Sequence, residues 1–120
     1  MNIKHRQETD LNCNLNAIAD LCRKSIQLLE KGLKRPPAEL QLDVDKVENL
    51  VAKVRDCFIE RLRKDQSAAN SRWRAPLDEI NVAVSLIAAV EYPATGVNRV
   101  HTEEALKIIR NLEKDVSTQM

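Results

Sequence analysis

Apolar residues recur three and four positions apart along most of the chain, and this spacing places their side chains on one face of an α-helix. Only two glycines and four prolines interrupt the 120 residues. The apolar stripes and the interruptions predict four helices, over residues 10–31, 43–64, 73–91 and 102–116, which follow a polar N-terminal tail, residues 1–8. No segment sustains the alternation of apolar and polar residues that is typical of a half-buried strand. The sequence therefore predicts an all-α protein.

The ends of the predicted helices carry residues that commonly cap helices. Thr9 or Asp10 is suited to cap the first helix, and Gly32 is suited to end it in the left-handed conformation. Asp43 is the expected cap of the second helix. Thr102 is followed by two glutamates, the pattern of a cap and an acidic first turn, so we expect the fourth helix to begin there.

The connections between the predicted helices are short, and short connections favour neighbours that run in opposite directions. The expected architecture is an antiparallel, up-down-up-down four-helix bundle in which residues 1–120 form a single domain. A content of 43% hydrophobic residues is enough for a core, and 31% charged residues are enough for a solvated surface.

Each predicted helix has an inward seam of apolar residues, and the third helix has two seams on roughly opposite sides. The inward seams are Leu11, Leu15, Ile18, Cys22, Ser25 and Leu29; Val44, Val47, Val51, Val54, Phe58 and Leu62; Leu77, Ile80, Val84 and Ile87; and Ala105, Ile109, Leu112 and Val116. The second seam of the third helix consists of Val82, Leu86 and Ala89. A corner helix of a monomeric bundle exposes one face to water, so a second apolar seam predicts self-association, with a homodimer as the expected assembly. The alternative is that this helix lies at the centre of an irregular bundle.

The segment from residue 61 to residue 74 is the most basic part of the chain. Its net charge is +4, although the formal charge of the whole protein is only +1. This basic end consists of Arg61, Arg63, Lys64, Arg72 and Arg74, with Trp73 between the last two arginines. Clustered cations can bind phosphates or an acidic protein, so the basic end is a candidate site for an anionic partner, an acidic protein or a nucleic acid. The alternative is that these cations finish a helix while Trp73 covers the end of the core.

Cysteine and histidine positions give no support for a cofactor or a metal site. Cys13, Cys22 and Cys57 are odd in number and show no metal-binding spacing, so we expect unpaired thiols in a reducing compartment. Cys13 falls off the inward seam of its helix and is therefore expected to react before Cys22. His101 and Glu104 would supply two metal ligands where a site needs three or four, so the pair is interpreted as helix-end electrostatics.

The remaining observations exclude several classes of protein. The acidic residues fall off the apolar seams, no glycine-rich phosphate loop occurs, and no apolar run is long enough to span a membrane. These features favour a cytoplasmic, non-enzymatic interaction or accessory protein that associates with itself. A nucleic-acid-associated protein that uses the basic end is the alternative, and an enzyme with a site assembled from residues distant in sequence is a third possibility.

Overall fold

The computed structural model describes residues 13–34, 42–65, 71–90 and 96–119. The chain forms four helices within these ranges, α2 (Leu15–Leu33), α3 (Val44–Lys64), α4 (Arg74–Ala88) and α5 (Gly96–Thr118), and the same ranges contain no strand. The all-α prediction is therefore confirmed for the part of the chain that the structure describes. None of the described helices is both long enough and apolar enough to cross a lipid bilayer.

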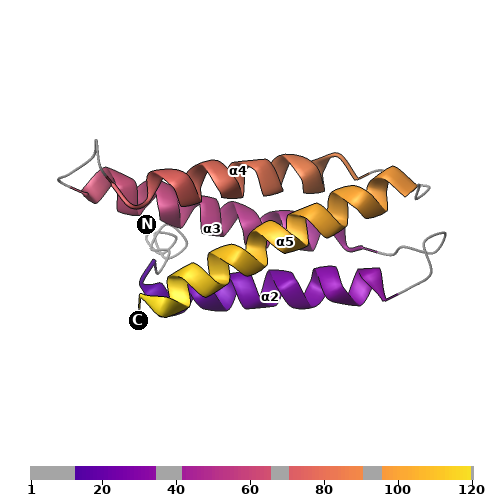
Figure 1. Cartoon of the computed structure of the whole chain (residues 1–120), viewed down its shortest axis with the longest axis horizontal. Coiled ribbons are helices and arrows are strands. Elements are labelled where there is room, and N and C mark those ends of the chain that lie inside the picture. Colours follow the sequence, from indigo (N-terminus) through magenta and orange to yellow (C-terminus); the bar gives the residue numbers. More distant parts are fainter. Residues whose placement is uncertain (1–12, 35–41, 66–70, 91–95, 120) are drawn as a thin grey trace, which may run out of the picture.

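The four helices lie lengthwise beside one another and pack in a ring (Figure 1). The main contacts of α2 are with α3 and α5, and the main contacts of α4 are with the same two helices. Each helix thus has two principal neighbours, and α4 occupies a corner of the ring. The alternative explanation for the two apolar seams of α4, a central position in the bundle, has no support in this arrangement.

Most of the core comes from the inward seams that the sequence predicts, and the other buried hydrophobic residues are Ala19, Leu42, Cys57, Trp73, Ala83, Val90 and Leu106. Buried core residues on these seams are Ile18, Cys22, Leu29, Val47, Val51, Val54, Phe58, Ile80, Ile87, Ala105, Ile109, Leu112 and Val116. Residues at the ends or edges of the seams, such as Leu15, Leu62 and Val84, are only partly buried against this cluster. Full burial of a large aliphatic or aromatic side chain contributes roughly 1.5–3 kcal/mol, so the seams supply the main stabilisation of the fold. Leu11 lies outside the described residues.

The first turns of α2 and α3 are both stabilised by a polar side chain that caps the helix. The Asn14 side chain accepts a hydrogen bond of 2.8 Å from the amide three residues on, so α2 begins at Leu15. Asp43 caps α3 in the same way at 3.1 Å, as the sequence predicts. The predicted start of the first helix at residue 10 is wrong, because Cys13 and Asn14 precede α2 and are not helical. Its expected caps, Thr9 and Asp10, lie outside the described residues.

The prediction that Gly32 ends the first helix is wrong. Gly32 is buried inside the last turn of α2, and the C-cap is Lys34, which has a right-handed backbone conformation. The Lys34 amide donates to the Glu30 carbonyl oxygen, so the helical pattern of bonds continues past the glycine. The Leu33 carbonyl oxygen accepts a hydrogen bond of 2.6 Å from the guanidinium of Arg99 on α5.

The prediction that Thr102 caps the fourth helix is also wrong, because α5 already begins at Gly96. Thr102 is fully buried, and its hydroxyl donates to the Asn98 carbonyl oxygen one turn earlier. Buried positions 98, 102, 105, 109, 112 and 116 of α5 follow a single spacing of three and four residues. The inward face therefore includes two polar residues at its start, and their polarity hides the continuation of the apolar stripe in the sequence.

The third helix, α4, matches its predicted start closely. Trp73 is its N-cap residue and Pro76 lies in its first turn, where a missing amide hydrogen costs no helical bond. Its last helical residue is Ala88, so the helix is shorter than the predicted range of 73–91. Residues 91–95 lie outside the described part of the chain.

Candidate functional site

The two seams of α4 differ in burial. On the inward seam, Ile80 and Ile87 are completely buried and Leu77 and Val84 are partly buried; Ala83, which the predicted seam omits, is also completely buried. On the second seam, Val82 is 52% exposed, Leu86 is partly buried and Ala89, the C-cap residue, is exposed. Val82 and Ala89 therefore lie outside the core, whereas Leu86 packs partly against it, and Val82 is one of the most exposed large hydrophobic residues of the described chain.

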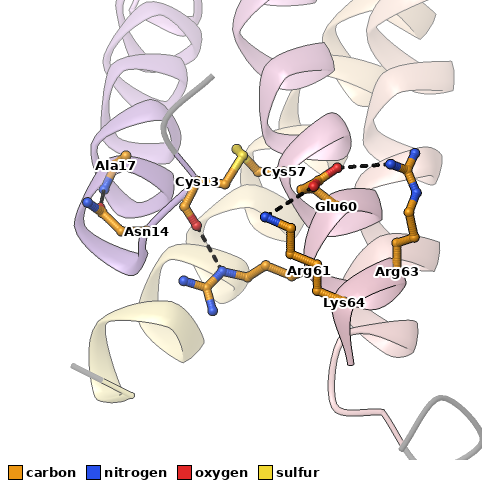
Figure 2. Close-up of a disulfide and its surroundings, with 8 residues drawn as sticks. All are labelled: Cys13, Asn14, Ala17, Cys57, Glu60, Arg61, Arg63 and Lys64. Carbon is orange, nitrogen blue, oxygen red and sulfur yellow. Dashed lines mark hydrogen bonds and ion pairs between the residues drawn. A yellow bond between two sulfur atoms is a disulfide. The ribbon is translucent and has the colours of Figure 1, made fainter. Parts of the chain in front are cut away.

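Two cations of the basic end are engaged by one carboxylate. Glu60 forms an ion pair with Arg63 and another with Lys64, each at 3.2 Å, and Figure 2 shows both side chains reaching the carboxylate along α3. Exposed ion pairs of this kind contribute little stability, at most about 1 kcal/mol. The pairing still reduces the charge that Arg63 and Lys64 can offer to a partner.

Arg61 and Arg72 lie together on the same indole ring. Their guanidinium carbons are 4.9 Å and 5.1 Å from the centre of the Trp73 ring. Burial lowers the pKa of the Arg61 guanidinium, and the neighbouring positive charge of Arg72 lowers this pKa further. Among the described residues, neither arginine forms an ion pair with a carboxylate. The structure thus brings together three of the six residues proposed for the basic end.

Trp73 itself is covered rather than presented to solvent. The side chain is only 4% exposed, and its ring stacks on Phe58 of α3 with ring centres 5.8 Å apart. Aromatic side chains that bind nucleic acid bases need an accessible face. Trp73 therefore covers this end of the core, and it offers no platform on which a base can stack. Arg74 is exposed at the first position of α4.

Cys13 and Cys57 form a disulfide, with their Cα atoms 5.1 Å apart (Figure 2). The prediction of three unpaired thiols is wrong for this pair, and so is the expectation that Cys13 reacts before Cys22. The argument from unpaired cysteines to a reducing compartment fails with it, because disulfides persist mainly in oxidising compartments. Beside the disulfide, the Cys13 carbonyl oxygen accepts a hydrogen bond of 2.8 Å from Arg61 Nε.

The predicted topology contained a signal for this disulfide. In an up-down bundle the start of the first helix lies beside the last part of the second; Cys13 precedes α2, and Cys57 lies about two turns before the end of α3. The spacing of cysteines along the sequence cannot show such proximity, since the two residues are 44 positions apart. The third cysteine, Cys22, is unpaired and buried, and burial together with the negative charge of Glu113 raises its pKa to about 12.

No other cluster in the described residues converges on a reactive centre. His101 lies within α5 rather than before it, and its Nδ1 atom is buried without a hydrogen-bond partner. Across the described ranges, no three histidine, cysteine or acidic side chains are close enough together to hold a metal ion. An open groove of about 530 Å³ runs along α5 beside α4. Its lining mixes acids and lysines: Glu79, Glu104, Lys107, Ile108, Asn111, Lys114 and Asp115.

No protein-family model matches this chain, and neither a curated protein nor a solved structure matches it significantly.

Proposed function

We propose that this chain is an up-down-up-down, antiparallel four-helix bundle that acts as a non-enzymatic interaction protein. It associates with a second copy of itself through the second seam of α4, Val82, Leu86 and Ala89. The observation that carries this proposal is the exposure of Val82, which is 52% exposed on a helix that buries Ile80 and Ile87 in the core.

The antiparallel arrangement is supported by the contacts between α2 and α5. Arg23 of α2 pairs with Glu113 of α5 at 2.9 Å, whereas Leu33, at the other end of α2, accepts a hydrogen bond from Arg99. Residue numbers thus rise along α2 while they fall along the residues of α5 that face it. Opposite directions for these two helices agree with the short connections that the sequence predicts.

Self-association is supported by the difference between this seam and another edge of the ring. Between α2 and α5, charged side chains form ion pairs across the helices, Arg23 with the partly buried Glu113 and Arg110 with Glu30. On the second seam of α4 the outermost side chain is that of Val82. Most soluble oligomers are symmetric homodimers, in which one patch meets its own copy, so a second copy of this chain is the simplest cover for this seam.

Replacing Val82 and Leu86 together by glutamate tests the proposal. Two charges placed in an apolar interface would be buried without partners, so the dimer is expected to dissociate into a folded monomer with unchanged helicity, as measured by light scattering and circular dichroism. Asn81 and Ser85 have the same spacing on α4 and are exposed polar residues outside the seam, so their replacement by glutamate is the matched control. A monomeric unmodified protein, or a Val82/Leu86 variant that unfolds, would overturn the proposal.

A second candidate function is the binding of an anionic partner at the basic end. The observation in its favour is that Arg61 and Arg72 lie together at Trp73 without a described carboxylate as partner. Binding through phosphates weakens steeply with salt, so retention of the protein on a nucleic acid matrix at low salt, lost at higher salt, tests this candidate.

A further inference from the structure

Arg61, in the last turn of α3, and Arg72, just before α4, both lie over the ring of Trp73. Two guanidinium groups of like charge share one buried indole, and like charges close together repel. A surface cation is normally free to turn toward solvent or toward an acid, as Arg63 does with Glu60. Arg61 and Arg72 instead both lie over the Trp73 ring, near enough that the charge of Arg72 lowers the pKa of Arg61, and an anion between them would offset this repulsion.

Several contacts hold Arg61 in place at this position. Its Nε atom donates to the Cys13 carbonyl oxygen, and the disulfide to Cys57 fixes the backbone that carries this oxygen. Figure 2 shows the two terminal nitrogens of Arg61 pointing away from the disulfide. The Nε–H group of Arg61 is therefore bonded within the protein, while the N–H groups of its two terminal nitrogens can donate to a ligand. A planar group held in this way loses little freedom when it binds an oxyanion.

The local electrostatics are favourable for negative charge. Glu60, which lies next to Arg61 in sequence, is engaged by Arg63 and Lys64. The N-terminus of α4 lies beside Arg72, its first turn contains no acidic residue, and its N-cap residue makes no side-chain capping bond. Helix N-termini carry a partial positive charge that adds to the charge of nearby arginines.

We infer that Arg61 and Arg72, held against Trp73 beside the N-terminus of α4, form a binding site for a phosphate group. This inference rests on the second candidate function, the binding of an anionic partner, and specifies that the group recognised on that partner is a phosphate. Because Trp73 is covered by Phe58 and the two arginines, the site binds phosphate without base stacking. A free phosphate and the backbone of a nucleic acid present the same group, and the experiment separates these two sources.

Trp73 is the single tryptophan of the chain, so its fluorescence reports directly on this site. Inorganic phosphate is titrated at constant ionic strength against chloride, and a ten-nucleotide single strand of DNA is titrated in parallel. We expect a saturable change in Trp73 emission, and an increase in Tm with phosphate concentration as an independent measure of binding to the folded state. If the strand binds at least tenfold more tightly per molecule than phosphate, a nucleic acid is the source; if not, a free phosphate is.

The variants Arg72→Gln and Arg63→Gln separate a defined site from general attraction. Each removes one positive charge from the basic end, but only Arg72 contacts Trp73. Arg72→Gln is expected to weaken the phosphate response roughly tenfold or more, whereas Arg63→Gln changes it less than about twofold. Helicity measured by circular dichroism confirms that both variants are folded.

Three results would overturn the inference in distinguishable ways. Absence of a saturable phosphate effect on both Trp73 emission and Tm removes the site. Equal weakening by the two variants shows general attraction without a site. If a DNA strand binds independently of Arg72, the protein binds an anionic partner, but not through the Arg61–Arg72 site. If no anion binds, both the second candidate function and the phosphate site are refuted.

Discussion

The two ends of α2 are fastened in chemically different ways. At its start, Cys13 is joined to Cys57 of α3 by a disulfide, and Arg61 of α3 donates to the Cys13 carbonyl oxygen. At its end, the Leu33 carbonyl oxygen receives a hydrogen bond from Arg99 of α5, an arginine that also pairs with Glu103 at 3.7 Å. Both ends use an arginine from a neighbouring helix to satisfy a main-chain oxygen, but only the first end is covalent.

The two ends of α2 show how a helix end is held to its neighbours with and without a covalent bond. The last carbonyl oxygens of a helix have no partners within the helix, and a basic side chain near the C-terminus commonly binds them. At the start of α2 the side chain of Asn14 caps the helix, so the disulfide and Arg61 act on the residue that precedes the cap. The first end is thus held before the helix begins, whereas the second end is held at the helix itself.

The largest expected effect follows from breaking the covalent end. A crosslink that closes a loop of about 44 residues stabilises a fold by roughly 4 kcal/mol in the chain-entropy description. Reduction with dithiothreitol is therefore expected to lower the free energy of unfolding by roughly that amount, as measured by urea denaturation.

The double variant Cys13→Ser/Cys57→Ser is the control for this experiment. It should match the reduced protein in stability, and dithiothreitol should have no further effect on it. An unchanged urea midpoint after complete reduction would show that the two ends of α2 depend equally on non-covalent contacts.

The second prediction concerns the non-covalent end. Arg99→Ala removes a charged donor from a partly buried carbonyl oxygen, which is expected to cost about 1.5–3 kcal/mol of unfolding free energy. Arg110→Ala removes the same charge from the same helix, but its partner Glu30 is an exposed side chain, so the expected cost is at most about 1 kcal/mol.

Urea denaturation measures both arginine variants, and hydrogen exchange of the last turn of α2 locates the change. Faster exchange there in Arg99→Ala, with the first turn unaffected, would sharpen the contrast between the two ends. Equal costs for Arg99→Ala and Arg110→Ala would contradict a special role for the main-chain contact.

The smallest expected effect lies in the middle of α2, at Cys22. Its pKa is about 12 in the folded protein and near 9.0 in a solvated thiol. Above pH 9 the unfolded chain loses this proton while the folded protein retains it, so the stability present below pH 9 is lost progressively as the pH rises toward 12. At pH 10 the expected loss is roughly 1 kcal/mol, because one pKa unit corresponds to about 1.4 kcal/mol.

This loss is measured in the Cys13→Ser/Cys57→Ser background, where Cys22 has no disulfide with which to exchange. The triple variant that also carries Cys22→Ala shows the contribution of the other titrating groups. Identical decreases in stability between pH 8 and pH 10 in the two proteins would refute the buried-thiol explanation.

The sequence predicted those features of the fold that depend on periodicity. A spacing of three and four residues identified the inward seams, and the short polar side chain of Asp43 identified the start of α3. Both patterns are local, because a spacing of three or four residues and a helix cap each involve residues that are close together in the sequence of one helix. The second seam of α4 was found in the same way; Val82 and Ala89 are exposed and Leu86 is partly buried, and the role of this seam in self-association stays a prediction.

Features that depend on three-dimensional proximity were missed or placed wrongly. The Cys13–Cys57 disulfide joins residues from different helical segments, so no local pattern contains it. Arg61, Arg72 and Trp73 were grouped by their basic segment, but their contacts across the indole ring were not predicted. The start of α5 was placed too late because Thr102, a buried side chain that bonds to its own helix, has the same residue type as a cap.

The ring of helices has a consequence for the order in which the protein folds. Three of its interfaces join helices that follow one another in sequence, whereas the interface of α2 with α5 joins residues such as Arg23 and Glu113, which are 90 positions apart. Closing so long a loop costs more entropy than forming the local pairs, so we expect this interface to form late, after the transition state. Weakening the α2–α5 interface would then accelerate unfolding and leave the folding rate almost unchanged. We therefore expect α2 and α5 to separate first when the bundle unfolds.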